Sequence, residues 1–323
     1  MDELDNNIKI KKAQIIMRIT FGILLFVFVA GIFLAYHYSK KSDTETSGFN
    51  NTTAGVFDKL HIEAKSAFVY DINKHKVMYA KNKELQLPLA SVTKIMTALV
   101  AREMFGNNQL VKISSYSIKP EGDSGLMVGE KWKLKDLIDF TLISSSNDGA
   151  RAIASVGALS IKNKNEQVNS DYPKKEGAFI KFMNKKVKEL GLKQTYYINE
   201  SGLDFNGDVA GAYGSAKDMA MLFSYVLKKY PDLLEATSHN FIEVKSATLV
   251  HKAKNTNKIV EQIPGIIASK TGYTDLAGGN LIVAFDAGPE RPIVISVLGS
   301  GVKGRFNDVI RLVNASLEQI KEN

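Results

Sequence analysis

LPLASVTKIMTAL, at residues 87–99, is the stretch of sequence from which the fold is best inferred. Pro88 closes a loop and apolar residues then recur at helical spacing, so we expect a helix that begins near Ser91. At this helix start, Ser91 and Lys94 are three positions apart, which places their side chains on one face, one turn apart. A serine nucleophile needs a neighbouring base, and a desolvated lysine near a second cation can lose its proton and act as one. The pair alone is a weak signal, because residues 300–303 (SGVK) have the same spacing.

Two further short motifs follow along the chain. Residues 145–147 (SSN) come after an expected helix and offer a second hydroxyl for proton relay and an amide that could hold a substrate backbone. Residues 270–272 (KTG) end an expected strand, where an extended substrate could lie against the strand edge. Ser-x-x-Lys, Ser-x-Asn and Lys-Thr-Gly in this order are typical of penicillin-binding proteins and class A β-lactamases. The second Ser-x-x-Lys falls after the Lys-Thr-Gly and does not fit this order.

Outward from these motifs, the hydrophobic pattern predicts strands at both ends of the outer chain and helices between them. The expected strands are residues 66–71, 76–80, 241–244, 266–270, 280–285 and 293–298. The other expected helices are residues 133–142, 148–156, 177–190, 215–228 and 305–320, with a surface loop at 162–175. This order implies an α/β (α+β) domain in which the first hairpin joins the late strands in an antiparallel sheet covered by helices.

The composition excludes several classes of protein. Apolar residues make up 45% and charged residues 24% of the chain, values that are ordinary for a folded protein. The net charge of +8 is mild, and no Lys/Arg block is interleaved with aromatics, so we expect no nucleic-acid partner. Zero cysteines exclude disulfides, a thiolate nucleophile and Fe–S clusters, and the five histidines show no metal-ligand spacing, so we expect no metal or cofactor.

The N-terminal part has a different pattern. Residues 19–38 (ITFGILLFVFVAGIFLAYHY) carry no charge and are long enough to cross the hydrocarbon core of a bilayer, roughly 30 Å. More cationic residues precede this run than follow it closely, which favours a cytoplasmic N-terminus. We therefore expect a cytoplasmic tail (1–18), one transmembrane helix (19–38), a flexible linker (39–58) and an extracytoplasmic folded domain (59–323). A cleaved secretory signal is the alternative, but its apolar part is usually shorter, about 7–15 residues.

Through its motifs and the segments around them, the chain resembles the D-alanyl-D-alanine carboxypeptidases, the low-molecular-mass penicillin-binding proteins. The segments include AKSAFVYDINKHKVMYAKN, NESGLDFNG, GSAKDMAML and ASKTGYTDLAGGNL, and the likeness covers roughly residues 64–315. It implies the three-layer penicillin-binding-protein/β-lactamase-like fold, with the active site between an antiparallel sheet and a helical region. The implied substrate is the D-Ala-D-Ala end of the peptidoglycan stem peptide, and the implied inhibitors are β-lactam antibiotics.

The resemblance assigns catalytic roles residue by residue. Ser91 would be the nucleophile and Lys94 its base. Ser145 would pass a proton toward the leaving D-alanine, and Lys270 would tune the proton network electrostatically.

The implied substrate-binding residues are Asn147, Lys270, Thr271, Gly272, Tyr273 and Arg305. Asn147 would hold the substrate amide, while Thr271 and Arg305 would bind the terminal carboxylate, a task that suits a forked guanidinium. The backbone N–H groups of Ser91 and Tyr273 would form the oxyanion hole. The sequence departs from the family at Tyr273, where histidine is common, and at the middle residue of Ser-x-Asn, where glycine is frequent. Both departures could alter the rate or the substrate preference.

Three alternatives remain open. A class A β-lactamase needs a glutamate in a Glu-x-x-Leu-Asn loop that activates the deacylating water, and neither Glu166 (EQVNS) nor Glu200 (ESGLD) fits that pattern. An endopeptidase acting on peptidoglycan cross-links would use the same residues as a carboxypeptidase. A catalytically inert wall-binding scaffold would be expected to lack a reacting residue, and none is missing.

Overall fold

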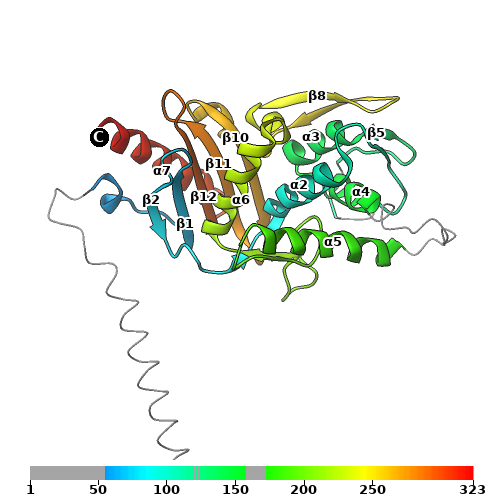
Figure 1. Ribbon diagram of the computed structural model, residues 1–323, viewed down its shortest axis with the longest axis horizontal. Coiled ribbons are helices and arrows are strands. Elements are labelled where there is room, and N and C mark those ends of the chain that lie inside the picture. The colour runs from blue at the N-terminus through cyan, green and yellow to red at the C-terminus, as the bar shows by residue number, and fades with distance from the viewer. Residues whose placement is uncertain (1–54, 119–120, 123, 158–171, 323) are drawn as a thin grey trace, which may run out of the picture. The chain divides into compact units, whose positions relative to one another are not determined.

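The structure, a computed structural model, describes residues 55–118, 121–122, 124–157 and 172–322 (Figure 1). The expected tail and transmembrane helix, and the expected linker up to residue 54, lie outside these residues. Within them, no helix has both the length and the apolar character to cross a membrane. At the end of the expected linker, Val56–Lys59 forms a 3-10 helix (η1), and buried Phe57 stacks on Tyr79 with ring centroids 5.3 Å apart.

The centre of the fold is a five-stranded antiparallel sheet in the order β10-β11-β12-β1-β2. The strands are β1 (Ser66–Asp71), β2 (Lys76–Lys81), β10 (Ile266–Thr274), β11 (Gly278–Asp286) and β12 (Pro292–Ser300). The N-terminal hairpin joins the late strands through β1, which pairs antiparallel with β12 so that Ser66 faces Leu298. This confirms the predicted antiparallel sheet and its connection.

Helices cover both faces of the sheet and produce three layers. Val283 and Phe285 of β11 lie in a core with α7 (Gly304–Lys321), whereas Ile282 and Ala284 lie in a second core with α6 (Ala216–Lys229). Figure 1 shows the two helices on opposite sides of the sheet. Because both faces are buried, the central strands are apolar at nearly every position instead of alternating with polar residues.

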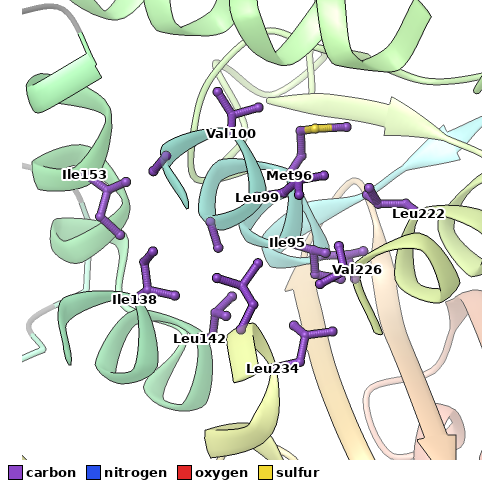
Figure 2. Close-up of a cluster of buried hydrophobic side chains, with 14 of the residues drawn as sticks. Ile95, Met96, Leu99, Val100, Ile138, Leu142, Ile153, Leu222, Val226 and Leu234 are labelled. Carbon is purple, nitrogen blue, oxygen red and sulfur yellow. The ribbon is translucent and has the colours of Figure 1, made fainter. Parts of the chain in front are cut away.

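The second core continues into a helical region that forms the other half of the fold. Its helices are α2 (Lys94–Phe105), α3 (Leu134–Ser144), α4 (Asn147–Gly157) and α5 (Tyr172–Glu189). Figure 2 shows Ile95 and Leu99 of α2 packed among side chains from α3, α4 and α6. The helix that carries the Ser-x-x-Lys motif therefore lies at the centre of this region, and its buried face fixes its position.

Several elements differ from the prediction. The strands that were not predicted are β3 (Leu87–Pro88), β4 (Leu110–Lys112), β5 (Lys131–Lys133), β6 (Tyr196–Tyr197), β7 (Ala212–Gly214) and β9 (Val250–Lys254). The expected strand at 241–244 exists as β8 (Phe241–Lys245), but it pairs with β9 in a separate ribbon rather than with the main sheet. Residues 172–175 were expected in a loop but form the start of α5. Proline is compatible with the first turn of a helix, so Pro173 does not prevent the helix from beginning here. The other 3-10 helices in the described part of the chain are η2 (Ala90–Thr93), η4 (Pro231–Leu233), η5 (Glu235–Ser238) and η6 (Val260–Gln262).

Candidate active site

Ser91 lies in the 3-10 helix η2, immediately before α2. Ala90 just before it has φ 48°, a left-handed conformation that costs energy for a residue with a side chain. The surrounding structure stabilises this turn, because the buried Asn280 amide of β11 donates to the carbonyls of Pro88 and Leu89, both at 3.0 Å. The turn thus presents the Ser91 hydroxyl at the edge of the sheet.

Lys94 is fully buried, and its amine has three polar neighbours. Nζ lies 2.8 Å from Ser91 Oγ, 2.8 Å from Asn147 Oδ1 and 2.7 Å from the Ser201 carbonyl oxygen. The amide and carbonyl oxygens can only accept hydrogen bonds, so they use two N–H groups of the amine. A neutral amine then has its lone pair left for the Ser91 hydroxyl, which is the arrangement that a general base requires.

The environment of Lys94 favours this neutral form. Burial lowers the pKa of the Lys94 amine from 10.5 to about 7, and the nearby Glu200 carboxylate opposes the shift without cancelling it. A large fraction of the amine is therefore uncharged near neutral pH.

Ser145 and Asn147 come from the corner between α3 and α4. Ser145 caps α3 with φ 62°, and Asn147 is the first residue of α4. Ser145 Oγ accepts a 2.8 Å hydrogen bond from Lys270 Nζ, while the Asn147 amide donates to the Glu121 carbonyl at 2.7 Å. The site therefore contains two Ser–Lys pairs, one formed within the helix start and the other between the corner and β10.

The second lysine, Lys270, is also buried. Its Nζ donates to the Thr271 carbonyl at 2.9 Å as well as to Ser145. Burial, followed by the positive charges of Lys94 and Arg305, lowers the pKa of the Lys270 amine well below its ordinary value. Charging one amine therefore disfavours charging the other.

The remaining predicted site residues lie along and beside β10. Gly272 packs on the Ser91 turn, where an added Cβ would lie 2.8 Å from the Leu89 carbonyl oxygen, too close for any side chain. Arg305 of α7 is buried and its Nη1 donates to the Gly272 carbonyl at 2.8 Å, so it is not a solvated helix-start residue. Tyr273 is exposed, and the Arg305 guanidinium lies 5.9 Å from the centre of its ring.

Sequence reasoning missed the hydroxyl partner of Thr271. Thr256, which follows β9, has its Oγ1 2.6 Å from Thr271 Oγ1, and its backbone N–H donates to the Ile143 carbonyl near the α3–α4 corner. Thr256 therefore links the two sides of the site. Its position depends on the β8–β9 ribbon, of which only the strand β8 was predicted, and that in the wrong sheet.

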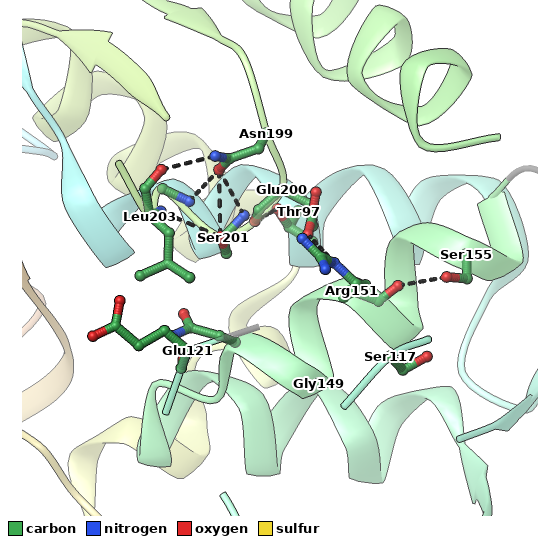
Figure 3. A network of polar contacts seen from close by, with 12 residues as sticks. Thr97, Ser117, Glu121, Gly149, Arg151, Ser155, Asn199, Glu200, Ser201 and Leu203 are labelled. Atoms are coloured by element: carbon green, nitrogen blue, oxygen red, sulfur yellow. Dashed lines mark hydrogen bonds and ion pairs between the residues drawn. The ribbon is translucent and has the colours of Figure 1, made fainter. Parts of the chain in front are cut away.

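Sequence reasoning also missed the backbone support of Lys94. The segment 199–203 supplies the Ser201 carbonyl to Lys94. It also supplies the Glu200 carbonyl to Thr97 Oγ1, 2.6 Å away (Figure 3). The Glu200 carboxylate is buried and paired with Arg151 Nε at 3.3 Å. The Asn-x-x-Gly-Leu pattern at 199–203 was the available signal for this segment.

Within the described residues, no group of three or more His, Cys, Asp or Glu side chains is arranged to hold a metal ion.

Comparison with known proteins gives consistent matches. The family model for D-alanyl-D-alanine carboxypeptidase matches residues 51–301. D-alanyl-D-alanine carboxypeptidase DacF from Bacillus subtilis is 32% identical over 277 residues, which cover 81% of this chain and 64% of that protein. D-alanyl-D-alanine endopeptidase from Pseudomonas aeruginosa is 28% identical over 267 residues, covering 80% of this chain and 79% of that protein. The match thus spans less than two thirds of DacF.

A solved structure shares the fold. Penicillin-binding protein D2 from Listeria monocytogenes, in its ampicillin-bound form, is 26% identical and superposes with a TM-score of 0.62. The superposition covers 80% of this chain and 98% of that chain. The penicillin-binding-protein-like α+β fold is therefore shared over nearly all of that structure.

Proposed function

Because this chain belongs to the D-alanyl-D-alanine carboxypeptidase family, we propose that it removes the terminal D-alanine from peptidoglycan stem peptides through an acyl-enzyme on Ser91. The observation that carries the proposal is the contact of 2.8 Å between Ser91 Oγ and a buried amine whose two other neighbours can only accept hydrogen bonds. Such an amine is suited to take the serine proton.

In the acylation step, neutral Lys94 accepts the Ser91 proton while Oγ attacks the carbonyl carbon between the two D-alanines. The carbonyl oxygen gains negative charge, which the backbone N–H groups of Ser91 and Tyr273 would stabilise. Gly272 supports this assignment, because its tight packing on the Ser91 turn brings β10 next to the serine amide. Asn147 would orient the substrate amide.

The C–N bond then breaks, and the leaving D-alanine nitrogen takes up a proton. Ser145 is suited to deliver it, because its hydroxyl can donate to the nitrogen while Lys270 donates to its oxygen. The departing carboxylate would be held by the Thr271 hydroxyl and by the positive charge of Arg305. Lys94, protonated in the acylation step, gives up this proton to restore the Ser145 hydroxyl and becomes neutral again. Water then attacks the ester carbonyl and loses a proton to Lys94, which passes it to Ser91 Oγ as the ester bond breaks and the shortened peptide is released.

β-lactams would acylate Ser91 by the same first step, but the opened ring remains attached to the ester. Rapid hydrolysis of that ester would need a carboxylate that activates water. Glu200 is paired with Arg151 and buried, which argues against this role, and Glu166 lies outside the described residues. We therefore favour a slowly hydrolysed penicilloyl-enzyme over β-lactamase activity.

A second candidate activity is endopeptidase cleavage of peptidoglycan cross-links. It is favoured by the Pseudomonas aeruginosa relative, which is named a D-alanyl-D-alanine endopeptidase. The same reacting groups serve both reactions, so the products distinguish them.

The proposed location is the outer face of the cell membrane, with residues 19–38 as the anchor, because that run is uncharged and long enough to span a bilayer.

The test is to incubate the protein separately with a purified stem pentapeptide, with cross-linked peptide dimers and with benzylpenicillin. A carboxypeptidase releases D-alanine from the pentapeptide, whereas an endopeptidase splits the dimers. Benzylpenicillin should add its full mass to the peptide that contains Ser91 and block D-alanine release, and Ser91→Ala should lose both effects. Sustained penicillin hydrolysis without an adduct would favour a β-lactamase, and no reaction at all would favour an inert scaffold.

A further inference from the structure

A groove of 790 Å³ lies beside the segment 199–203, and none of the residues proposed to react lines it. Residues of α5 line one wall of the groove, and residues from Ile198 to Phe205 line the other. Arg151 of α4 also lines the groove. Figure 3 shows that chain with the Arg151–Glu200 ion pair beside it. The volume lies within the range of ligand pockets in proteins, roughly 300–1,000 Å³.

The charges around this groove are unbalanced. Its lining contains four cationic side chains (Arg151, Lys181, Lys185 and Lys188) and two carboxylates (Glu200 and Asp204). Glu200 is paired with Arg151, and Asp204 accepts a 3.0 Å hydrogen bond from Thr274 Oγ1, a neutral donor. Lys181 and Lys188 line the groove from α5, are exposed, and have no hydrogen-bond or ion-pair partner among the described residues. The lining of the groove therefore has a net charge of +2, and Lys181 and Lys188 are its cations without a partner among the described residues.

The two lysines also define a spacing. They are seven residues apart on one helix, which places them nearly two turns apart on the same side, roughly 10 Å along the axis. In an extended peptide of polyproline II form, side chains three residues apart lie on the same side and about 9 Å apart. Two acidic side chains at positions i and i+3 of such a peptide would match the lysines.

The lining also contains apolar side chains. Ile180 of α5 faces the groove, and Ile198 and Phe205 line the opposite wall, with the Phe205 side chain 73% exposed. A large aromatic side chain in water is available to bind another apolar group. This combination fits a ligand with a carbon skeleton between its charges better than a phosphate polymer, which has little apolar surface.

We infer that this groove is a second binding site of the protein, specific for an acidic peptide segment whose carboxylates lie three residues apart with apolar residues between them. The site is distinct from the proposed active site, although it adjoins the segment whose Ser201 carbonyl supports Lys94. Peptide binding here does not require that Ser91 reacts.

The probe is acetyl-Glu-Leu-Leu-Glu-amide, compared with acetyl-Gln-Leu-Leu-Gln-amide, and the protein is the full chain with Ser91→Ala, which removes acylation. Titration calorimetry measures the dissociation constant at low and high salt. The acidic peptide should bind and weaken with salt, and the glutamine peptide should bind much more weakly. Replacing Lys181 and Lys188 together by Ala should weaken binding roughly tenfold, since exposed ion pairs each contribute a few-fold in affinity.

Two control variants locate the site. Lys74→Ala with Lys76→Ala removes the same charge from the β1–β2 hairpin and should leave binding unchanged. Gly177→Leu should weaken binding without any change of charge, because Gly177 lines the groove, a Cβ there meets nothing within 4 Å, and leucine favours a helix.

Several results would overturn the inference. They are no binding of the acidic peptide, equal binding of both peptides, or a Lys181→Ala/Lys188→Ala variant that binds as well as the parent. Tighter binding of inorganic triphosphate than of the peptide, lost in the same lysine variant, would show a phosphate site instead of an acidic-peptide site. None of these outcomes depends on carboxypeptidase activity.

Discussion

Single residues in this site owe their chemistry to burial. The Lys94 amine reaches two oxygen acceptors and one hydroxyl only because α2, α4 and the segment 199–203 surround it. In water the same amine would remain charged, and the Ser91 proton would have no acceptor nearby. The reactivity proposed for the serine is therefore a property of the packed core.

Lys94→Met tests this dependence. We expect the rate of Ser91 acylation to fall by at least about 100-fold, because general-base catalysis typically contributes a factor of 10²–10⁴. Labelling with a fluorescent penicillin measures the rate, and a thermal melt checks that the variant is folded. Lys193→Met, at an exposed position, is the matched control and should label normally. Normal labelling of a folded Lys94→Met protein would place the base elsewhere.

The pH dependence follows from the same amine. With a folded-state pKa of about 7, Lys94 becomes neutral as the pH rises through 7, so the acylation rate should rise about tenfold per unit below pH 7 and level off above about pH 8. In the unfolded chain Lys94 keeps its ordinary pKa of 10.5, so between about pH 7 and 10.5 the unfolded chain binds more protons at this residue than the folded chain does. The contribution of Lys94 to the free energy of unfolding therefore also rises with pH over this range. Stopped-flow acylation from pH 5.5 to 9 tests the rate profile. A profile that is flat, or that inflects above pH 9, would contradict a neutral Lys94 base.

The residues in short motifs could be proposed from the sequence, but their partners could not. Ser91 and Lys94 are neighbours on one helix turn, so their contact follows from spacing alone. Asn280 and Thr256 contact the site from distant parts of the chain, through the sheet and the β8–β9 ribbon. A single asparagine or threonine in a strand or loop has no sequence signature of such a role.

At the scale of elements, the segment 199–203 and the turn at Ser91 hold each other in place. Gly202 has φ 80°, and a Cβ on it would overlap the Ala90 carbonyl. The same close approach allows the Ser201 carbonyl to reach Lys94. The conformation of one loop therefore sets the position of the catalytic candidates on another.

Gly202→Ala tests this coupling between the two segments. We expect the protein to lose about 1–3 kcal/mol of stability, because alanine is strained at this φ, and more if the overlap with Ala90 cannot relax. Penicillin acylation should slow as well, since Ser201 must move. Denaturant unfolding and labelling measure the two effects. Gly207→Ala lies in the same loop region, where a Cβ meets nothing within 4 Å, and should change stability by less than about 0.5 kcal/mol. Equal behaviour of the two variants would contradict the proposed coupling.

Long elements could be predicted and short ones could not. The five strands of the sheet and the main helices have apolar patterns that extend over several residues, and they occur where the sequence indicates. Strands of two or three residues, such as β3 and β5, are too short to show a period of two. The strand β8 was recognised as a strand but assigned to the wrong sheet, because pairing partners are chosen by tertiary contacts rather than by the pattern of one segment.

At the scale of the whole molecule, the candidate site depends on both halves of the fold. Lys270 and Gly272 come from the sheet, whereas Ser145 and Asn147 come from the helical region. The hydrogen bond between Lys270 and Ser145 joins the two. Displacing the halves by an ångström would separate this pair, so the common core beneath them is part of the catalytic arrangement.

The topology of the chain gives the last prediction. Residues 19–38 carry no charge, and cationic residues cluster before them, so we expect an uncleaved anchor with the linker (39–58) and the folded domain (59–323) outside the cell membrane. The protein should sediment with membranes, resist extraction by high salt and carbonate, and be released by detergent. N-terminal sequencing of this membrane-bound protein should find a start before Ile19. External protease should degrade the folded domain in intact spheroplasts but leave a peptide containing residues 1–18 protected. A mature start beyond Tyr38, or release by salt alone, would contradict the anchor, because a cleaved signal leaves nothing in the bilayer and a peripheral attachment is screened by ions.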